Sequence, residues 1–201
     1  PAMWRSTWQL VNSIVPYIAL WVGMYFSLRV SYLLTLVLAL VAGGFLTRIF
    51  IIFHDCGHGA FFKSRQANDF WGILTGVLTF TPYYEWRHEH AIHHAGSSNL
   101  ERRGVGDVWT LTVDEYLALS RFDRIKYRVY RHPLFLFTVA PVFTFLVLQR
   151  FPIPQSKGAR ERGSIRFTNI ALLLIAIILS LVMGWKEYLL IQLPVIGFAA
   201  I

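Results

Sequence analysis

Long apolar runs at both ends of the chain flank a central segment that is rich in charge. The runs at residues 11–27 and 32–53 carry almost no charged side chains. At a rise of about 1.5 Å per residue they would extend about 26 Å and about 33 Å as helices, enough to cross a bilayer core. Runs at 167–185 and 188–201 have the same character, with "WKEY" as the turn between them. The pattern therefore predicts an all-α, polytopic membrane protein with four transmembrane helices.

Residues 54–166 form a long insert whose apolar stretches are too short to cross a membrane. Asn68–Pro82 fits an interfacial or re-entrant helix, and Leu134–Leu148 is similar but is interrupted by Pro141. Basic residues flank Leu134–Leu148 on both sides, so a full crossing would leave one basic cluster on the wrong face of the membrane. The insert holds 15 of the 19 Lys and Arg residues. By the positive-inside rule we expect the whole insert to be cytoplasmic.

Composition agrees with a membrane protein. Hydrophobic residues make up 55% of the chain, and the net charge is +8. In so apolar a chain this basic excess fits the positive-inside rule, and we expect no nucleic-acid partner. Cys56 is the single cysteine, which excludes an internal disulfide. The chain begins at Pro1 and stops within an apolar run at Ile201, so we expect both ends to be cuts in a longer protein, with residues 1–201 forming one membrane domain.

Six of the seven histidines lie in two short strings, "FIIFHDCGHGAFF" and "WRHEHAIHH". In the first string His54 and His58 are four residues apart, directly after the second apolar run. In the second string the spacing is i, i+3, i+4, at His90, His93 and His94. On helices each set shares one face, so five imidazoles on two helices are expected to converge on a metal. Imidazole suits zinc, copper, iron and nickel.

The second ring nitrogen of a metal-bound histidine usually needs a carboxylate or carbonyl partner. The acidic candidates for this outer shell are Asp55, Glu85, Glu89 and Asp107. His88 lies two residues before His90 and projects off the ligand face, either as a further outer-shell donor or as an exposed side chain. A lone histidine near a membrane interface is more often structural than a ligand, and we assign His132 to the surface. Two clusters at helical ligand spacing favour a metal site instead.

These two strings resemble the first two histidine boxes of the integral-membrane fatty acid desaturases. "HDCGH" at His54–His58 is followed some thirty residues later by "HAIHH" at His90–His94. Together with "HDCGHGAFF", the stretch "SNLERRGVGDVWTLTVDEY" is similar to the bacterial and plastid-type acyl-lipid desaturases of the omega-6 (delta-12) group. The likeness runs from about Trp4 to the end of the chain.

The resemblance implies a centre of two iron ions that activates dioxygen and removes two hydrogens from an acyl chain of a membrane lipid. It implies His54, His58, His90, His93 and His94 as iron ligands, with electrons from ferredoxin or cytochrome b5. It also implies a multi-pass protein of the bacterial inner membrane with its histidine boxes on the cytoplasmic face. The basic run "RFDRIKYRVYR" is either a docking face for the electron carrier or a solvated face near anionic lipid.

The chain departs from the family pattern in two respects. A third box, usually HxxHH, is absent and is expected beyond Ile201, so this chain alone is expected not to complete a two-iron site. His88 stands where the family has an aromatic residue. A membrane hydroxylase or carotenoid ketolase would use similar boxes. A non-catalytic metal or haem binder and a purely structural membrane domain also stay open at this point.

Overall fold

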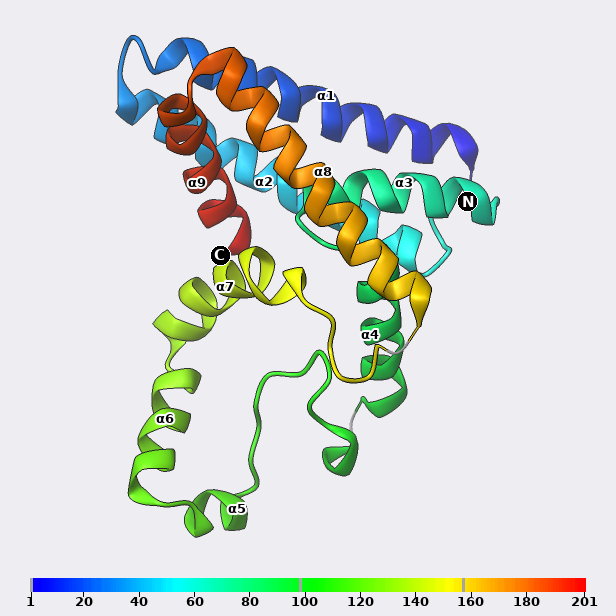
Figure 1. Cartoon of the computed structure of the whole chain (residues 1–201), viewed down its shortest axis with the longest axis vertical. Helices are drawn as coiled ribbons and strands as arrows, with labels where there is room; N and C mark the ends of the chain where they lie inside the picture. The colour runs from blue at the N-terminus through cyan, green and yellow to red at the C-terminus, as the bar shows by residue number, and fades with distance from the viewer. Residues whose placement is uncertain (1, 98, 157) are drawn as a thin grey trace.

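The computed structural model describes residues 2–97, 99–156 and 158–201. Within these residues the chain is helical and contains no strand (Figure 1). The longer helices are α1 (Met3–Ser27), α2 (Tyr32–Gly57), α3 (Arg65–Leu78), α4 (Tyr83–Gly96), α6 (Arg121–Arg131), α8 (Ala159–Met183) and α9 (Trp185–Ala200). Shorter ones are η1 (Leu100–Arg102), α5 (Val113–Ala118), η2 (Phe135–Val139), α7 (Ala140–Leu146) and η3 (Leu148–Arg150). The all-α prediction is confirmed.

Among the described residues, three helices are long and apolar enough to cross a membrane: α1, α2 and α8. A fourth crossing would arise if α6 and Phe135–Arg150, which meet at a 60° bend, were one broken span. The predicted crossing at 188–201 corresponds to α9, which has 16 residues and is not one of the three. The polytopic helical membrane protein predicted from the sequence is confirmed. The interfacial or re-entrant course of Leu134–Leu148 stays a prediction, because the 60° bend lies before this segment, between Arg131 and Phe135.

The helix bounds differ from the apolar runs. α1 and α8 each begin eight residues before the run they contain, because a helix continues through polar residues as it leaves the bilayer. The prediction of a turn at "WKEY" is wrong, since these residues form the first turn of α9. The reversal is confined to Gly184, whose φ of 99° lies in the left-handed region that glycine adopts without a steric penalty.

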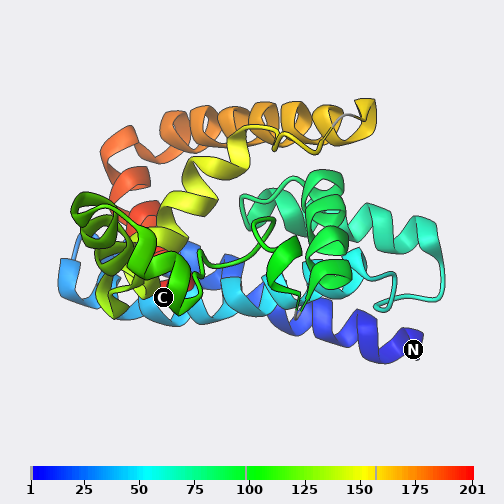
Figure 2. The same ribbon diagram turned by 90° about the horizontal axis from the view of Figure 1, so that it is seen from below.

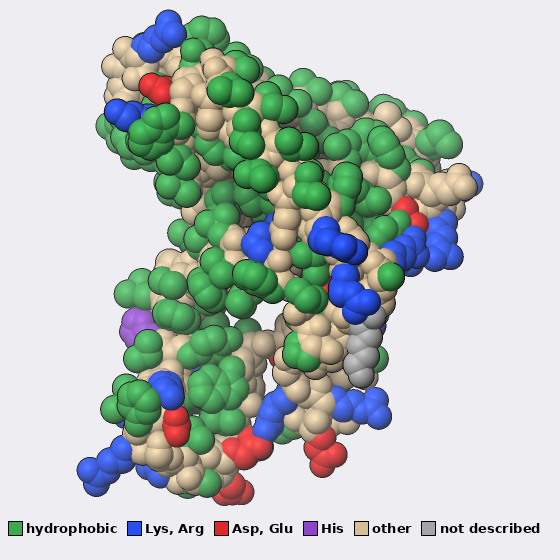
Figure 3. All heavy atoms as spheres, in the orientation of Figure 1, with side chains coloured by type: hydrophobic (Ala, Val, Ile, Leu, Met, Phe, Trp, Pro, Cys, Tyr) green, Lys and Arg blue, Asp and Glu red, His purple; other side chains and the backbone are tan. Residues whose placement is uncertain are grey.

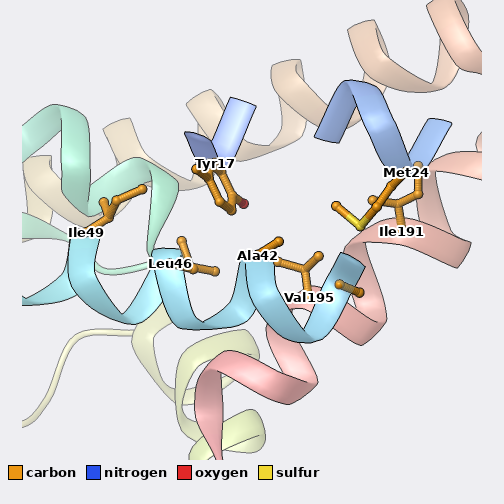
Figure 4. Close-up of a cluster of buried hydrophobic side chains, with 8 residues drawn as sticks. Tyr17, Met24, Ala42, Leu46, Ile49, Ile191 and Val195 are labelled. Carbon is orange, nitrogen blue, oxygen red and sulfur yellow. The ribbon is translucent and has the colours of Figure 1, made fainter. Parts of the chain in front are cut away.

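α2 is the central helix of the membrane bundle and packs against α1, α3 and α9. Figure 4 shows the apolar core that these contacts form, with Tyr17 and Met24 from α1, Ala42, Leu46 and Ile49 from α2, and Ile191 and Val195 from α9. A Cβ added at Gly43 would lie 2.9 Å from Cβ of Phe198, so this glycine lets the backbones of α2 and α9 approach closely.

Charged side chains divide the surface into two parts. In the space-filling view, hydrophobic side chains cover the bundle formed by α1, α8 and α9, while Lys, Arg, Asp and Glu gather mainly over α4, α5, α6 and the start of α8 (Figure 3). Arg29 and Lys186 lie beside the two reversals at the opposite end of the bundle. Figure 1 shows α5 and α6 at the end of the molecule away from α1, and the view from below shows α1 and α8 on opposite sides of the bundle (Figure 2). This distribution is what a membrane bundle with a charged insert at one end requires.

A buried polar contact fixes the connection from α2 to α3. Asn68, only 2% exposed, accepts a hydrogen bond from the Phe62 N–H at 2.8 Å and donates to the Phe62 carbonyl at 2.7 Å and the Ser64 carbonyl at 3.0 Å. Asn68→Ala leaves the N–H and the carbonyl of Phe62 unpaired, while the Ser64 carbonyl keeps its bond from the backbone N–H of position 68. The substitution should lower the free energy of unfolding by about 2–3 kcal/mol. Denaturant unfolding of the full-length protein in detergent measures this loss. Gln66→Ala, at an exposed position of the same helix, should change stability by less than about 0.5 kcal/mol.

Candidate metal centre

The last turn of α2 positions the first pair of histidines. His54 lies in this turn and His58 is the C-cap residue, so the four-residue spacing places both rings on one side of the helix end. Their Nε2 atoms are 3.3 Å apart. The helix ends there because Gly59 follows with a φ of 68°, which turns the chain toward α3. The first histidine pair therefore lies where a membrane helix emerges from the bilayer.

α4 brings the second pair against the first. Nε2 of His90 lies 3.0 Å from Nε2 of His58 and 3.0 Å from Nε2 of His94. The start of α4 is held on α2 by Tyr83, whose hydroxyl donates to the Cys56 carbonyl at 2.8 Å. Four imidazoles from two helices therefore converge through the same ring atom.

This donor set fits a bound metal ion. A neutral imidazole nitrogen either donates or accepts one hydrogen bond, so converging Nε2 atoms do not satisfy one another fully. Separations of 3.0–3.3 Å between nitrogens are those expected of two ligands at about 2.1 Å from one ion, with an angle of about 90–105° between them. Ligand atoms of His54, His58 and His90 all lie within 4.8 Å of one another. Nitrogen ligands alone are compatible with iron, zinc or copper.

His93 lies beside this cluster. Its Nδ1 is 2.8 Å from Oδ1 of Asp107, and its ring stacks on that of His90 with the ring centroids 6.1 Å apart. The physical reason is helical geometry: at about 100° per residue, the i+3 position is turned well away from the i+4 position. The structure thus gathers four of the five predicted ligands and places the fifth next to a cavity that Glu89 and Gln149 also line. The ligand role of His93 stays a prediction.

The acidic candidates separate into different roles. Oδ1 of Asp55 lies 3.2 Å from Nδ1 of His54, the contact expected of an outer-shell carboxylate because it leaves Nε2 free for a metal. Glu85 is only 2% exposed and accepts hydrogen bonds from the Ile153 N–H and the Ser156 hydroxyl, so it anchors the segment before α8. Glu89 lines the cavity beside His93, and burial raises its pKa.

The other two histidines lie outside the cluster. Among the described residues, no hydrogen bond links His88 to the four converging rings, so its outer-shell role stays a prediction. His132 is exposed, as expected, and its Nδ1 accepts from the Leu134 N–H at 3.3 Å.

Trp86 and Gly57 support the cluster, although neither is among the site residues predicted from the sequence. The Trp86 ring stacks on His90 with a centroid distance of 4.2 Å and an interplanar angle of 18°, and its centroid is 5.5 Å from that of His54. A Cβ at Gly57 would lie 2.6 Å from Cζ3 of this ring. Trp86 precedes His90 by four residues, which is the signal that was available in the sequence. Tryptophan is also common at membrane interfaces, so this spacing alone does not mark Trp86 as part of a site.

The environment favours the neutral, metal-binding form of two of the four rings. Burial, followed by the neighbouring His54 and His94 rings, lowers the pKa of His58. The same causes lower the pKa of His90 from 6.5 to about 4. Metal-binding imidazole is neutral, so near neutral pH these two rings need not release a proton before they bind a metal.

The depressed pKa of His90 predicts how the metal-free protein responds to acid. Below its ordinary pKa of 6.5 the unfolded chain takes up a proton that the folded ring accepts only near a pH of about 4. Stability should therefore be complete above about pH 6.5 and should fall as the pH decreases toward about 4. Thermal unfolding of the metal-free full-length protein across this range measures the slope. His90→Gln should flatten the slope and His132→Gln should leave it unchanged; an unaltered slope in His90→Gln would contradict the assignment.

Comparison with known proteins finds fatty acid desaturases and a related hydroxylase. The family model described as "Fatty acid desaturase" matches residues 31–201. A fatty acid desaturase of Bacillus subtilis is 50% identical over 197 residues, which cover 97% of this chain and 55% of that protein. An sn-1 oleoyl-lipid 12-desaturase of Synechocystis is 34% identical over 91 residues, covering 45% of this chain and 25% of the relative. An oleoyl-12-hydroxylase of Ricinus communis is 37% identical over 81 residues, covering 40% and 21%.

The share of each chain that these matches cover decides whether they show the family. No solved structure matches the chain. The chain spans about half the length of the Bacillus subtilis relative. The family model covers most of the chain and includes both histidine strings. The chain therefore belongs to the fatty acid desaturase family.

Proposed function

We propose that this chain is the membrane-embedded, histidine-bearing part of an enzyme that uses dioxygen to desaturate fatty acyl chains of membrane lipids. Its proposed reaction converts a monounsaturated chain to a diene at the delta-12 (omega-6) position. The observation that carries the proposal is the convergence of four Nε2 atoms, from His54, His58, His90 and His94, at the end of a membrane helix. The similarity to an oleoyl-lipid 12-desaturase supports the position of the new double bond.

The chemistry of the substrate explains why the site consists of metal ligands. An acyl methylene has no acidic proton and no polar handle, so side-chain acid–base catalysis cannot break its C–H bonds. Iron held by His54, His58, His90 and His94 would supply the oxidising power that side chains lack. Two iron ions need further ligands, and we assign that role to His93 and to histidines in the part of the protein that this chain does not span.

Two cavities, the first partly polar and the second mostly apolar, provide room for a chain beside the histidines. One is lined by Trp86, His90 and Phe145, and the other, of about 230 Å³, by Phe50, Thr79 and again Phe145. Phe145 lies between them and also contacts Phe50 edge-on, with the ring centroids 5.6 Å apart. In the proposed reaction these walls hold the acyl chain straight past His90 and keep water away from the reacting carbons.

The basic residues of the insert support a cytoplasmic location and an acidic electron-donor protein in this proposal. We place the insert, and with it the histidines, on the cytoplasmic face of a bacterial inner membrane, in line with the positive-inside rule. The proposed donor is a ferredoxin-like protein or cytochrome b5. The exposed cations of α6, such as Arg121 and Arg128, would attract an acidic carrier.

Lipid analysis of cells that express the full-length gene tests this proposal. We expect a new diene in the membrane lipids, with the second double bond located at delta-12 by mass spectrometry of fatty acid derivatives. A hydroxy acid in place of the diene would favour a hydroxylase. The similarity to an oleoyl-12-hydroxylase supports this function as the second candidate. Unchanged lipids together with a haem Soret band in the purified protein would favour a binding protein.

A further inference from the structure

A separate cavity lies inside the membrane bundle, between α1, the end of α3, α8 and α9. It has a volume of about 440 Å³, and its walls are mostly apolar side chains such as Ile18, Val22, Leu172 and Leu179. No charged side chain of the described residues lines it. Some of its walls face lipid: Val22 is 53% exposed and Val182 is 76% exposed. A molecule dissolved in the bilayer can therefore reach this cavity from the side.

Two buried donors in the wall of the cavity have no hydrogen bond of normal length and angle to any described residue. They are Nε2 of Gln192 and Nε1 of Trp21, and the Trp21 side chain lies beside the Tyr17 hydroxyl. Gln192 is only 8% exposed. Buried donors are nearly always paired, and the bilayer core has no water to pair them. A few polar groups that converge on an otherwise apolar cavity are the usual signature of a ligand site.

The end of the cavity that Gln192 lines is distant from the histidines, whereas the other end reaches Phe80, which also lines the 230 Å³ cavity. Its α1 wall lies level with the first half of α2, where Gly23 approaches Leu38. His54 is sixteen residues farther along α2, which corresponds to about 24 Å at 1.5 Å per residue. The cavity is nearer the reversal at Gly184, since Gln192 lies two turns into α9. It is thus a different site from the metal centre.

We propose that this cavity binds a glycerolipid of the surrounding membrane, with an ester carbonyl oxygen accepting from Gln192 and Trp21 and the acyl chain filling the apolar space. The unpaired groups are donors, so the ligand must present an acceptor. The absence of charge in the described lining favours a neutral oxygen over a phosphate or carboxylate. A carbonyl oxygen has two lone pairs, which match two donors. The bound lipid would join α1 to α8 and α9.

The test uses the full-length protein, purified in detergent, stripped of lipid and then given dioleoyl phosphatidylglycerol or its dioleyl diether analogue. The two lipids differ in the ester carbonyls. We expect the diester to raise the melting temperature by several degrees and the diether to raise it by less than half as much. Gln192→Leu and Trp21→Phe should remove the difference between the two lipids. Trp8→Phe, at a 54% exposed position of α1, should preserve it.

The lipid-free protein gives a second, independent readout. Without a ligand, Gln192→Leu removes an unpaired buried donor and should raise the melting temperature. A lower melting temperature would mean that Gln192 has a structural partner, and it would overturn the proposal. Equal stabilisation by diester and diether would overturn the carbonyl assignment, as would stabilisation by an added quinone but not by lipid. None of these readouts depends on desaturase activity, so the proposed function can fail separately.

Discussion

Replacing His90 with alanine is expected to abolish formation of the new double bond by the full-length enzyme and to remove most of its bound metal. His90 is the central ring of the cluster, because its Nε2 lies 3.0 Å from Nε2 of both His58 and His94. Loss of an outer-shell partner alone typically costs about 10–100-fold in metal affinity or activity, so loss of this ligand should cost at least about 100-fold. Fatty acid analysis of expressing cells and metal analysis of the purified protein measure the two effects.

His132→Ala is the matched control for this experiment. It removes the same side chain from an exposed site, where Nδ1 only accepts from a nearby backbone N–H. Metal content and product should stay at the level of the unmodified enzyme. If His90→Ala kept both its metal and its activity, the convergence of the four rings would have no functional meaning. If His132→Ala lost both, the losses in His90→Ala would not report on the cluster.

The membrane helices and the pairing of histidines within each helix were open to sequence reasoning because both depend on local periodicity. Apolar runs long enough to cross a bilayer leave few alternatives to a helix, which is why α1, α2 and α8 match predicted spans. A four-residue separation places His54 with His58, and His90 with His94, whatever the rest of the fold does.

Features that depend on contacts between distant segments were not predictable in the same way. Sequence spacing grouped His93 with His90 and His94, but in the structure it faces Asp107 across a loop. The close approach of α4 to α3 depends on Gly72, where a Cβ would lie 2.1 Å from the Tyr83 ring. A single sequence does not reveal which aromatic ring will occupy the space left by a glycine. The cavity beside Gln192 is likewise made by four helices whose spacing no local pattern encodes.

Gly57→Ala is expected to lower bound metal and activity by about 10–100-fold, the range typical of a lost outer-shell contact, in a protein that still folds. The added Cβ would lie 2.6 Å from the Trp86 ring. The Phe53 ring, whose centroid is 4.7 Å from that of Trp86, prevents the Trp86 ring from moving away from the added Cβ. The Trp86 ring would therefore be displaced against the His90 ring on which it stacks. Alanine itself favours the helix by about 1 kcal/mol over glycine, which offsets part of the cost to folding. Metal analysis and thermal unfolding separate the two effects.

Gly44→Ala makes the same substitution in α2 at a position with no atom within 4 Å of the added Cβ, so it should leave metal content unchanged. A double-mutant cycle then identifies the mediator. If Gly57 acts through the Trp86 ring, Trp86→Leu will itself lower metal content, and adding Gly57→Ala will lower it little further. Fully additive losses would mean that Gly57 acts on His58 through the backbone instead. The predicted non-additivity makes Trp86 a positioning residue: its ring fixes the plane of His90, and Gly57 provides the space in which that ring lies.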